Sequence, residues 1–271
     1  MPNFGMAEQY GIPCEDLSEN TWRLRANKHC PFVDAPCNKK GGVCTISDGS
    51  IYAICCPRRF REDGLMFKVV SELAFAKKGD MFAIGEVAFL QPVNNSSGAV
   101  GSIDNLIVLK DEGEIEDWCG IEIQAVYFSG RSMGGEIKHF EQKHELQAPA
   151  SRRPDFRSSA TKRLLPQLEI KVPTLRRWGK KMFVVVDQPF FDWMPEMEQA
   201  EHISNADICW IVFDLDRSVS PYKLRLSKAV MTTLEDSKEG LIAGVAPTKP
   251  SFEEKIEEKM ARNEEVLWST T

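Results

Sequence analysis

Two acidic residues and one amide stand at a spacing that could hold a divalent cation. Asp104 lies in a short apolar run, residues 102–109, and Glu122 and Gln124 lie in a second run, residues 120–125. Alternation along a strand places Glu122 and Gln124 on one face and the apolar residues between them on the other. The polar, glycine-containing stretch between the runs predicts a turn, so the strands should pair as a hairpin that brings Asp104 close to Glu122. The alternative is a solvated hairpin with ordinary surface polar groups.

Such a carboxylate pair suits the chemistry of phosphodiester hydrolysis. Mg²⁺ binds one or two carboxylates and takes its other ligands from water and phosphate oxygens. We therefore expect Asp104 and Glu122 to bind Mg²⁺, with the main-chain carbonyl of Ile123 as an additional ligand, and Gln124 to orient the attacking water. A neutral amide can hydrogen-bond that water, but it supplies neither a positive charge nor a useful proton acceptor.

A second candidate site lies in the loop-rich segment 29–60, here called the Cys module. Its four candidate ligands, separated by six, six and eleven residues, are Cys30, Cys37, Cys44 and Cys56. So short a segment holds too little apolar material for a core of its own, so we expect a tetrahedral metal to hold it together. Thiolate ligands fit iron and zinc equally well, and Cys55 competes with Cys56 as the fourth ligand. The remaining cysteines are expected to be buried thiols: Cys14, Cys119 and Cys209.

A basic segment provides a candidate surface for a polyanion. Residues 151–181 carry ten basic residues against two acidic ones, a charge of +8, which leaves −14 for the rest of a chain whose net charge is −6. One basic face on an acidic protein suits double-stranded DNA, whereas a solvated basic surface is the alternative. The expected DNA contacts are Arg152, Arg153, Arg157, Lys162, Arg163, Arg176 and Arg177. Segment 158–163 is the first choice for reading base edges, and the paired arginines are expected to contact phosphates.

The elements that must position these residues read as a mixed α/β arrangement. Helical spacing predicts a helix over residues 65–77, and β-branched runs predict strands at 81–90, 182–186 and 209–215, with 222–226 pairing nearby. Further helices are expected at 156–165, where Pro166 should end the helix, at 189–197, and at 252–266 with Ile256 and Met260 toward the body. Residues 92–98 read as a loop and residues 1–28 as an irregular leader. The result is an α/β fold with a mixed central sheet flanked by helices.

Length and composition set the domain organisation and the expected compartment. With 271 residues and 42% hydrophobic content the chain can bury a sizeable core in one or two domains. We place an N-terminal segment with the Cys module at residues 1–62 and a catalytic and DNA-recognition domain at residues 63–271. No stretch approaches the roughly 20 apolar residues of a membrane span, and the N-terminus lacks a signal-peptide pattern. The expected location is therefore the cytoplasm of a prokaryotic cell, where thiols stay reduced.

Three blocks of the sequence, taken in order, resemble the NotI restriction endonucleases. They are residues 30–59 with the four cysteines, residues 120–130 with Glu-x-Gln, and residues 210–216, and a weaker fourth block covers residues 158–163. The wider nuclease superfamily carries lysine at the last position of the carboxylate motif, whereas glutamine is part of the NotI pattern, so Gln124 favours this family.

The resemblance implies a fold, an activity and partners. It implies a restriction-endonuclease-like sheet and a type II restriction endonuclease that uses Mg²⁺ to cut both strands of a GC-rich palindromic site. It also implies structural iron in the Cys module and a cognate DNA methyltransferase in the same system. A palindrome cut on both strands calls for two active sites related by a two-fold axis, hence a homodimer. The alternatives are a catalytically inactive, metal-stapled DNA-binding protein and a structure-directed repair or RNA-processing nuclease.

Overall fold

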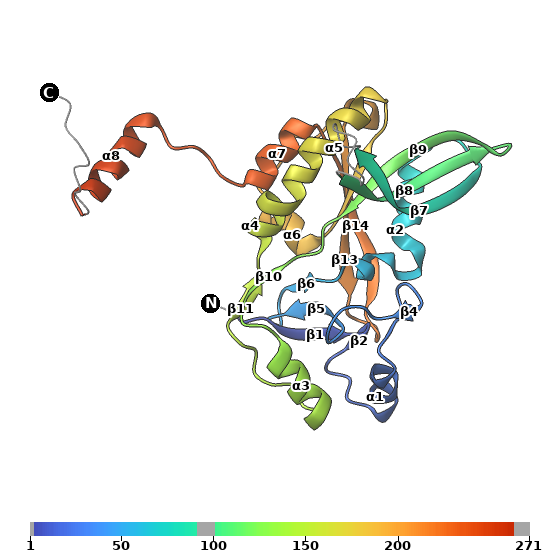
Figure 1. The fold of residues 1–271 in the computed structure, drawn as a ribbon, viewed down its shortest axis with the longest axis vertical. Helices are drawn as coiled ribbons and strands as arrows, with labels where there is room; N and C mark the ends of the chain where they lie inside the picture. The colour runs from blue at the N-terminus through green and yellow to red at the C-terminus, as the bar shows by residue number, and fades with distance from the viewer. Residues whose placement is uncertain (1–2, 91–100, 263–271) are drawn as a thin grey trace.

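A six-stranded mixed sheet forms the centre of the molecule in the computed structural model, which describes residues 3–90 and 101–262 (Figure 1). Its strands follow the order β14-β13-β12-β9-β8-β7. They are β7 (Asp80–Leu90), β8 (Gly101–Asp111), β9 (Glu114–Ile123), β12 (Met182–Asp187), β13 (Ile208–Asp216) and β14 (Lys223–Thr232). Strands β9, β12 and β13 run parallel, and the neighbours on either side run antiparallel. The predicted α/β fold with a mixed central sheet is confirmed.

The middle of this sheet is buried on both faces. Every residue of β12 is buried, and its run of three valines suits a parallel strand covered on both sides. Helices α5 (Leu165–Arg177) and α7 (Leu234–Ile242) pack on one face, and α2 (Leu65–Ala74) with the 3₁₀ segment η1 (Pro57–Gly64) packs on the other. The sheet thus forms the rigid layer from which the candidate catalytic side chains project.

One continuous helical segment crosses the face that α5 covers. It begins as α4 (Phe156–Ser159), passes through a π-helical turn, η2 (Ala160–Leu164), and continues as α5. The prediction that Pro166 ends the helix is wrong. Pro166 stands in the first turn of α5, directly after the π-helical turn, where the change in hydrogen-bond pattern accommodates its missing N–H and the chain stays helical.

The N-terminal residues form a second, smaller sheet, which contradicts the prediction of an irregular leader. The strand order is β2-β1-β5-β6, and the strands are β1 (Gly5–Gln9), β2 (Ile12–Pro13), β5 (Val43–Ser47) and β6 (Tyr52–Ile54). Helix α1 (Glu19–Ala26) follows β2 and is capped by Ser18, whose hydroxyl accepts from the N–H of Thr21. These strands are too short for the alternation of apolar and polar residues to be recognised in the sequence.

Short elements complete this end of the molecule. A small hairpin pairs β3 (His29–Cys30) with β4 (Ala35–Pro36), and another pairs β10 (Phe128–Gly130) with β11 (Arg152–Pro154). Helix α3 (Gly134–Lys143) lies between β10 and β11 in the chain and packs its Phe140 against the small sheet. Helix α6 (Gln188–Trp193) and the 3₁₀ turn η3 (Ile203–Asn205) connect β12 to β13.

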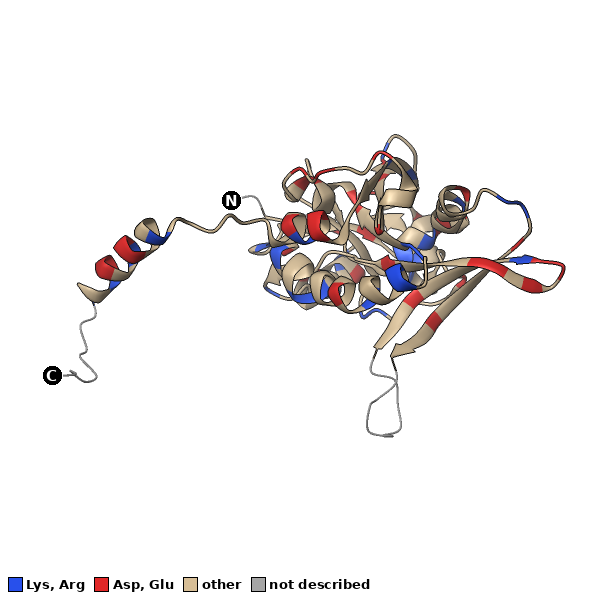
Figure 2. Ribbon diagram, turned by 90° about the horizontal axis from the view of Figure 1, so that it is seen from above, with Lys and Arg blue, Asp and Glu red and all other residues tan. Residues whose placement is uncertain are grey.

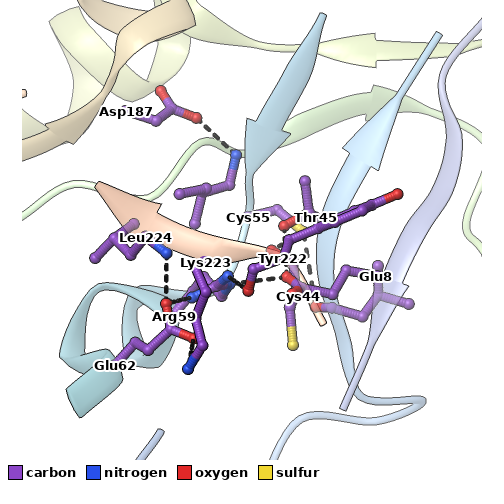
Figure 3. Close-up of polar contacts among 12 residues, drawn as sticks. Glu8, Cys44, Thr45, Cys55, Arg59, Glu62, Asp187, Tyr222, Lys223 and Leu224 are labelled. Atoms are coloured by element: carbon purple, nitrogen blue, oxygen red, sulfur yellow. Dashed lines mark hydrogen bonds and ion pairs between the residues drawn. The ribbon is translucent and has the colours of Figure 1, made fainter. Parts of the chain in front are cut away.

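A buried ionic network joins the small sheet to the central sheet (Figure 3). The Arg59 guanidinium donates to Glu8 Oε2 at 2.9 Å, to Glu62 Oε2 at 2.8 Å and to the Tyr222 carbonyl at 2.9 Å. Glu62 also accepts from the Leu224 N–H at 2.5 Å. Arg59 is fully buried, so its three polar partners hold the two sheets in one orientation.

Helix α8 (Lys249–Met260) stands away from the body of the molecule (Figure 1). Ile256 and Met260 are 42% and 58% exposed, so the prediction that they face the body is wrong. Figure 2 shows acidic and basic residues interspersed along α8 and acidic residues gathered at the tip of the β8–β9 hairpin. The end predicted for this helix, residue 266, and the loop predicted at 92–98 lie outside the described residues. No helix in the described ranges is long and apolar enough to cross a membrane.

Candidate active site and adjoining cleft

The β8–β9 hairpin brings the two predicted carboxylates together. Its turn places Glu112 and Gly113 at φ 47° and 89°, the left-handed pair that a two-residue hairpin requires. Asp104 Oδ2 accepts from the Ile123 N–H at 3.2 Å, and Glu122 Oε1 lies 3.4 Å from the Asp104 nitrogen. The two acidic residues therefore face each other across neighbouring strands, as the sequence predicts.

Glu122 occupies an unusual electrostatic position for a carboxylate. It is only 1% exposed. Burial, together with the neighbouring charge of Asp104, raises the pKa of Glu122 to about 7. The opposing influence is Lys171, whose Nζ lies 2.5 Å from Glu122 Oε1 and which lowers that pKa. Buried Glu122 and partly exposed Asp104, with one buried ammonium beside them, leave a local excess of negative charge, which is the condition that favours a bound cation.

Lys171 comes from α5, and sequence reasoning missed its role. It is 5% exposed and donates to Gln167 Oε1 at 2.8 Å as well as to Glu122. Its neighbours on the helix, Leu168, Val172 and Leu175, are buried in the core. A lysine inside an apolar helical stripe is the signal that identifies it, but the stripe is recognisable only if the helix continues beyond Pro166.

A cleft of about 870 Å³ opens beside the end of β9. Ile123 and Gln124 line it, and Gln124 is held by a hydrogen bond from its main-chain N–H to the Val185 carbonyl at 2.9 Å. The Gln124 amide donates to the Ala125 carbonyl at 2.6 Å, which leaves its oxygen as the group that can accept. Predicted ligand Ile123 and predicted water-orienting residue Gln124 therefore share the cleft wall.

Two of the predicted DNA contacts line this cleft. Lys162 and Arg163 belong to the π-helical turn η2 and are exposed. The Arg163 guanidinium lies 3.6 Å from the centre of the Tyr127 ring, which fixes its direction. The Cys module contributes Lys39 and Arg58, which sequence reasoning did not select. Four basic side chains thus line the cleft together with Gln124, whereas Asp104, Glu122 and Lys171 are not among its lining residues.

The other predicted contacts are dispersed. Arg152 is 2% exposed, and its guanidinium donates to Glu136 at 2.8 Å and to the Phe4 carbonyl at 3.0 Å, so the prediction that it contacts DNA is wrong. Arg176 forms an ion pair with Asp207, with Nε 2.9 Å from Oδ1, and is held at the surface.

Three predicted arginines remain exposed without lining the cleft. Arg153 lies on β11 and Arg157 on α4, and Arg177 donates to Thr174 Oγ1 at 2.9 Å. Arg177 follows Arg163 by fourteen residues, about 21 Å along a helix axis. The basic segment therefore does not form one face. It is spread along the helix that crosses the sheet.

The four predicted cysteine ligands converge in one small cluster with Phe32, and Cys55 is not among them. Cys55 follows β6 and packs in the neighbouring apolar cluster with Phe4 and Ile46, and its thiol donates to the Cys44 carbonyl at 3.4 Å. The Cys44 thiol donates to the Gly42 carbonyl at 3.4 Å. The interaction with Cys44, aided by Lys39, lowers the pKa of Cys56, whereas the interaction with Cys56 and burial raise the pKa of Cys44. Within the described residues, no group of three or more Cys, His, Asp or Glu side chains is arranged to hold a metal ion. The donor set itself suits a thiophilic metal.

The remaining cysteines agree with their prediction as buried thiols. Each is at most 2% exposed, and burial raises the pKa of each to about 12. They are Cys14, Cys119 and Cys209. Such thiols are neutral and inaccessible, so they take no part in the chemistry of the cleft.

Two carboxylates, an ammonium and an amide near a cleft lined by basic side chains are groups of the kind that hydrolysis of a polyanionic phosphodiester backbone uses. The family model described as restriction endonuclease NotI matches residues 15–226, which include the Cys module, the residues that line the cleft, and strands β7, β8, β9, β12 and β13 of the central sheet. The chain belongs to the NotI restriction endonuclease family, and it is a DNA-binding, DNA-cleaving restriction enzyme. A search of the curated proteins found no match.

Proposed function

We propose that the chain is a Mg²⁺-dependent type II restriction endonuclease that cuts both strands of a GC-rich palindromic DNA site. The observation that carries the proposal is the meeting of Asp104 and Glu122, with Lys171 paired to Glu122 and with Gln124, two residues further along the chain, lining a cleft that also holds basic side chains. Each of these groups has a use in phosphodiester hydrolysis, and a solvated surface hairpin would have no reason to bury Glu122, Gln124 and Lys171.

The carboxylates and the Ile123 carbonyl are the groups that would hold Mg²⁺. Their oxygens are the hard donors that this ion prefers, and the buried excess of negative charge favours it. When bound, the ion supplies a Lewis acid next to the scissile phosphate and makes water easier to deprotonate.

The protein's own side chains carry the remaining tasks. Asp104 is held in place by the Ile123 N–H, and Lys171 favours the ionised form of Glu122. The free oxygen of the Gln124 amide can accept a hydrogen bond from the attacking water and so aim it at phosphorus. Lys171 also places next to Glu122 the positive charge that glutamine cannot supply.

Specificity for DNA sequence is proposed to come from the π-helical turn. Lys162 and Arg163 project into the cleft, and cationic donors of this kind pair with guanine O6 and N7 in the major groove. Two copies of the chain related by a two-fold axis would present two such turns and two catalytic groups to a palindrome. In its host the enzyme is proposed to act alongside a DNA methyltransferase that masks the same site.

We further propose that Cys30, Cys37, Cys44 and Cys56 hold a structural iron ion, with zinc as the alternative. Their convergence and the lowered pKa of Cys56 support this, because metal ligands must be thiolates. Metal analysis of protein purified without chelator distinguishes the two metals. Cys56→Ser should lower the metal content, whereas Cys55→Ser should leave it unchanged.

The enzymatic proposal is tested by cleavage of a GC-rich plasmid and of genomic DNA with Mg²⁺. The wild type should give discrete double-strand fragments whose sequenced ends share one site. Asp104→Asn and Glu122→Gln should lose at least about a thousandfold in rate while still binding DNA, since each removes only charge from the metal-binding pair.

Two other results would replace the proposal. Tight DNA binding by the wild type without cutting at any Mg²⁺ or Mn²⁺ concentration would indicate a catalytically inactive DNA-binding protein. Ragged or single-strand products on every substrate would indicate a structure-directed nuclease.

A further inference from the structure

Tyr127 lies in the loop that follows β9, and its side chain lines the catalytic cleft together with Arg163. The carbon of the Arg163 guanidinium lies 3.6 Å from the centre of the Tyr127 ring. We propose that Tyr127 is a positioning residue for base recognition: its ring holds the guanidinium flat and so fixes the plane of the N–H donors that Arg163 presents in the cleft. The inference rests on the proposed function, because it concerns a residue that is assigned there to reading bases.

The distance between the two groups identifies how they meet. Carbon atoms in direct contact lie about 3.5 to 4.0 Å apart, so a guanidinium carbon 3.6 Å from a ring centre requires two stacked planes. An edge-on approach would place an N–H group between the carbon and the ring and would lengthen the distance. In the stacked arrangement the ring covers one face of the guanidinium. The N–H donors, which lie in the guanidinium plane, stay free for a planar acceptor.

The Tyr127 ring is the main restraint on the Arg163 side chain within the described residues. Arg163 is exposed and forms no ion pair or side-chain hydrogen bond with a residue that the structure describes. Arg59 also lies over a ring, that of Phe32 at 4.6 Å, but carboxylate and carbonyl oxygens hold its guanidinium as well. Without the Tyr127 ring, the long side chain of Arg163 would distribute over many rotamers.

The main chain of Tyr127 is fixed to the helical segment that carries Arg163. The Tyr127 N–H donates to Ser159 Oγ at 3.1 Å, and the Tyr127 carbonyl accepts from the Asp155 N–H at 2.6 Å. Asp155 caps α4, which continues directly into the π-helical turn. The ring is 49% exposed, and its hydroxyl forms no hydrogen bond with a residue that the structure describes. The ring therefore has a fixed base, and its contact with Arg163 does not depend on the hydroxyl.

The contact should affect sequence preference more than affinity. A bidentate pair between arginine and guanine discriminates against a wrong base by roughly fivefold to 150-fold, and this requires both donors to be aligned. A contact between a cation and a ring favours one arrangement by about twofold to thirtyfold. Removing the ring should therefore lower the discrimination at least about threefold, while the charge that attracts the phosphate backbone stays.

The experiment digests amplified genomic DNA with Mg²⁺ and sequences all the ends. For each enzyme it measures the ratio of cleavage at the preferred site to cleavage at sites with one changed base pair. Tyr127→Leu removes the ring, Tyr127→Phe keeps the ring without its hydroxyl, and Arg163→Met removes the guanidinium. A double variant combines Tyr127→Leu with Arg163→Met. The matched control is Tyr52→Leu, because the Tyr52 ring lies 4.0 Å from the Arg217 guanidinium carbon in a separate pocket.

Tyr127→Leu should lower this ratio at least about threefold, at the same base pair where Arg163→Met lowers it. The double variant should match Arg163→Met alone, because Tyr127 acts through the guanidinium. Tyr127→Phe and Tyr52→Leu should keep the wild-type ratio. Thermal melting checks that each variant is folded, and Tyr127→Met replaces Tyr127→Leu if the latter melts below the wild type.

Three results would overturn the inference. The first is a wild-type ratio in folded Tyr127→Leu, because the ring would then not orient the arginine. The second is an equal loss in Tyr127→Leu and Tyr127→Phe, which would assign the effect to the hydroxyl. The third is a full ratio in Arg163→Met, which would leave a restriction endonuclease that reads its site with other residues. A wild type that does not cut, or cuts without preference, overturns the proposed function and the inference together.

Discussion

Replacing Lys171 by methionine should change the pH dependence of cleavage. Methionine keeps much of the length of the stem and removes the charge, while Lys171 and Glu122 are almost completely buried and lie 2.5 Å apart. The Glu122 pKa is already about 7, because burial and the charge of Asp104 outweigh the attraction of Lys171. Removing the ammonium takes away the main influence that keeps Glu122 ionised, so the pKa should rise further.

The size of this rise follows from the geometry of the pair. Two unit charges about 4 Å apart interact by about 4 kcal/mol at an effective dielectric constant of about 20. This corresponds to an upper bound of about three pKa units. Water entering the vacated space will recover part of that energy, so we expect a rise of at least about one unit. At pH 7 the ionised fraction of Glu122 would then fall from about a half to about a tenth or less.

The assay is the initial rate of plasmid cleavage between about pH 6 and pH 9.5, with Mg²⁺ affinity measured by calorimetry over the same range. Lys171→Met should move the midpoint of the rate profile upward by at least about one unit and recover much of its rate at high pH. Lys180→Met is the matched control, because Lys180 pairs with Asp117 at the surface, away from Glu122. A profile lowered equally at every pH, with its midpoint unmoved, would refute the reasoning.

Three further predictions concern stability and DNA binding. Arg59→Met should lower the free energy of unfolding by about 3 to 5 kcal/mol in chemical denaturation, because Glu8 and Glu62 stay buried without their cation. A smaller decrease would mean that water reaches the two carboxylates. Burial raises the pKa of Asp187 from 3.8 to about 7, so its contribution to stability is present at low pH and lost as pH rises through 7. The free energy of unfolding of the wild type, taken relative to that of Asp187→Asn, should therefore fall by at most about 3 kcal/mol as pH rises from about 5 to 8.5, and a constant difference would contradict this. Lys162→Ala and Arg163→Ala should each weaken DNA binding and lower the slope of log affinity against log salt by about 1, because both residues line the cleft. Arg176→Ala should leave that slope unchanged and cost less than about 1 kcal/mol of stability, because its ion pair lies at the surface. Equal slopes for all three variants would contradict the assignment of Lys162 and Arg163 to the DNA-binding cleft.

The β8–β9 hairpin could be predicted from the sequence because its separate sequence features all indicate the same strand pairing. Two apolar runs, a polar turn and alternating side chains all indicate the same pairing, and Asp104 and Glu122 meet as that pairing requires. The buried strands at β12 and β13 were predictable for the same reason, since their β-branched runs suit only a covered sheet.

The position of Lys171 beside Glu122 could not be predicted, because the expectation that a proline ends a helix was applied to Pro166. Pro166 reads as a helix end, but it occupies the first turn of α5, where proline is accommodated. With the helix ended there, Lys171 falls in a stretch with no expected structure, and its apolar neighbours cannot be placed on one face. The burial of Arg152 was unpredictable for a different reason, since its partner Glu136 lies sixteen residues away on another element.

The small sheet shows the limit of periodicity in short strands. Each of its strands has two to five residues, so alternation has no room to rise above chance, and Glu8 and Gln9 look like surface residues. Their burial depends on contacts with Arg59 and with the Gly41 loop, which are distant in sequence. Tertiary contacts of this range decide burial where local patterns do not.

One continuous helical segment, residues 156 to 177, connects the proposed base-reading turn of the enzyme to its candidate catalytic site. Its first turns carry Arg163, the proposed reader of the bases, and Lys171 holds Glu122 about 12 Å further along the same axis. A shift of this helix along its axis would therefore move the Arg163 guanidinium and the Lys171 ammonium together. Fidelity can then be enforced at the moment of bond breaking, after the wrong sequence has already been bound.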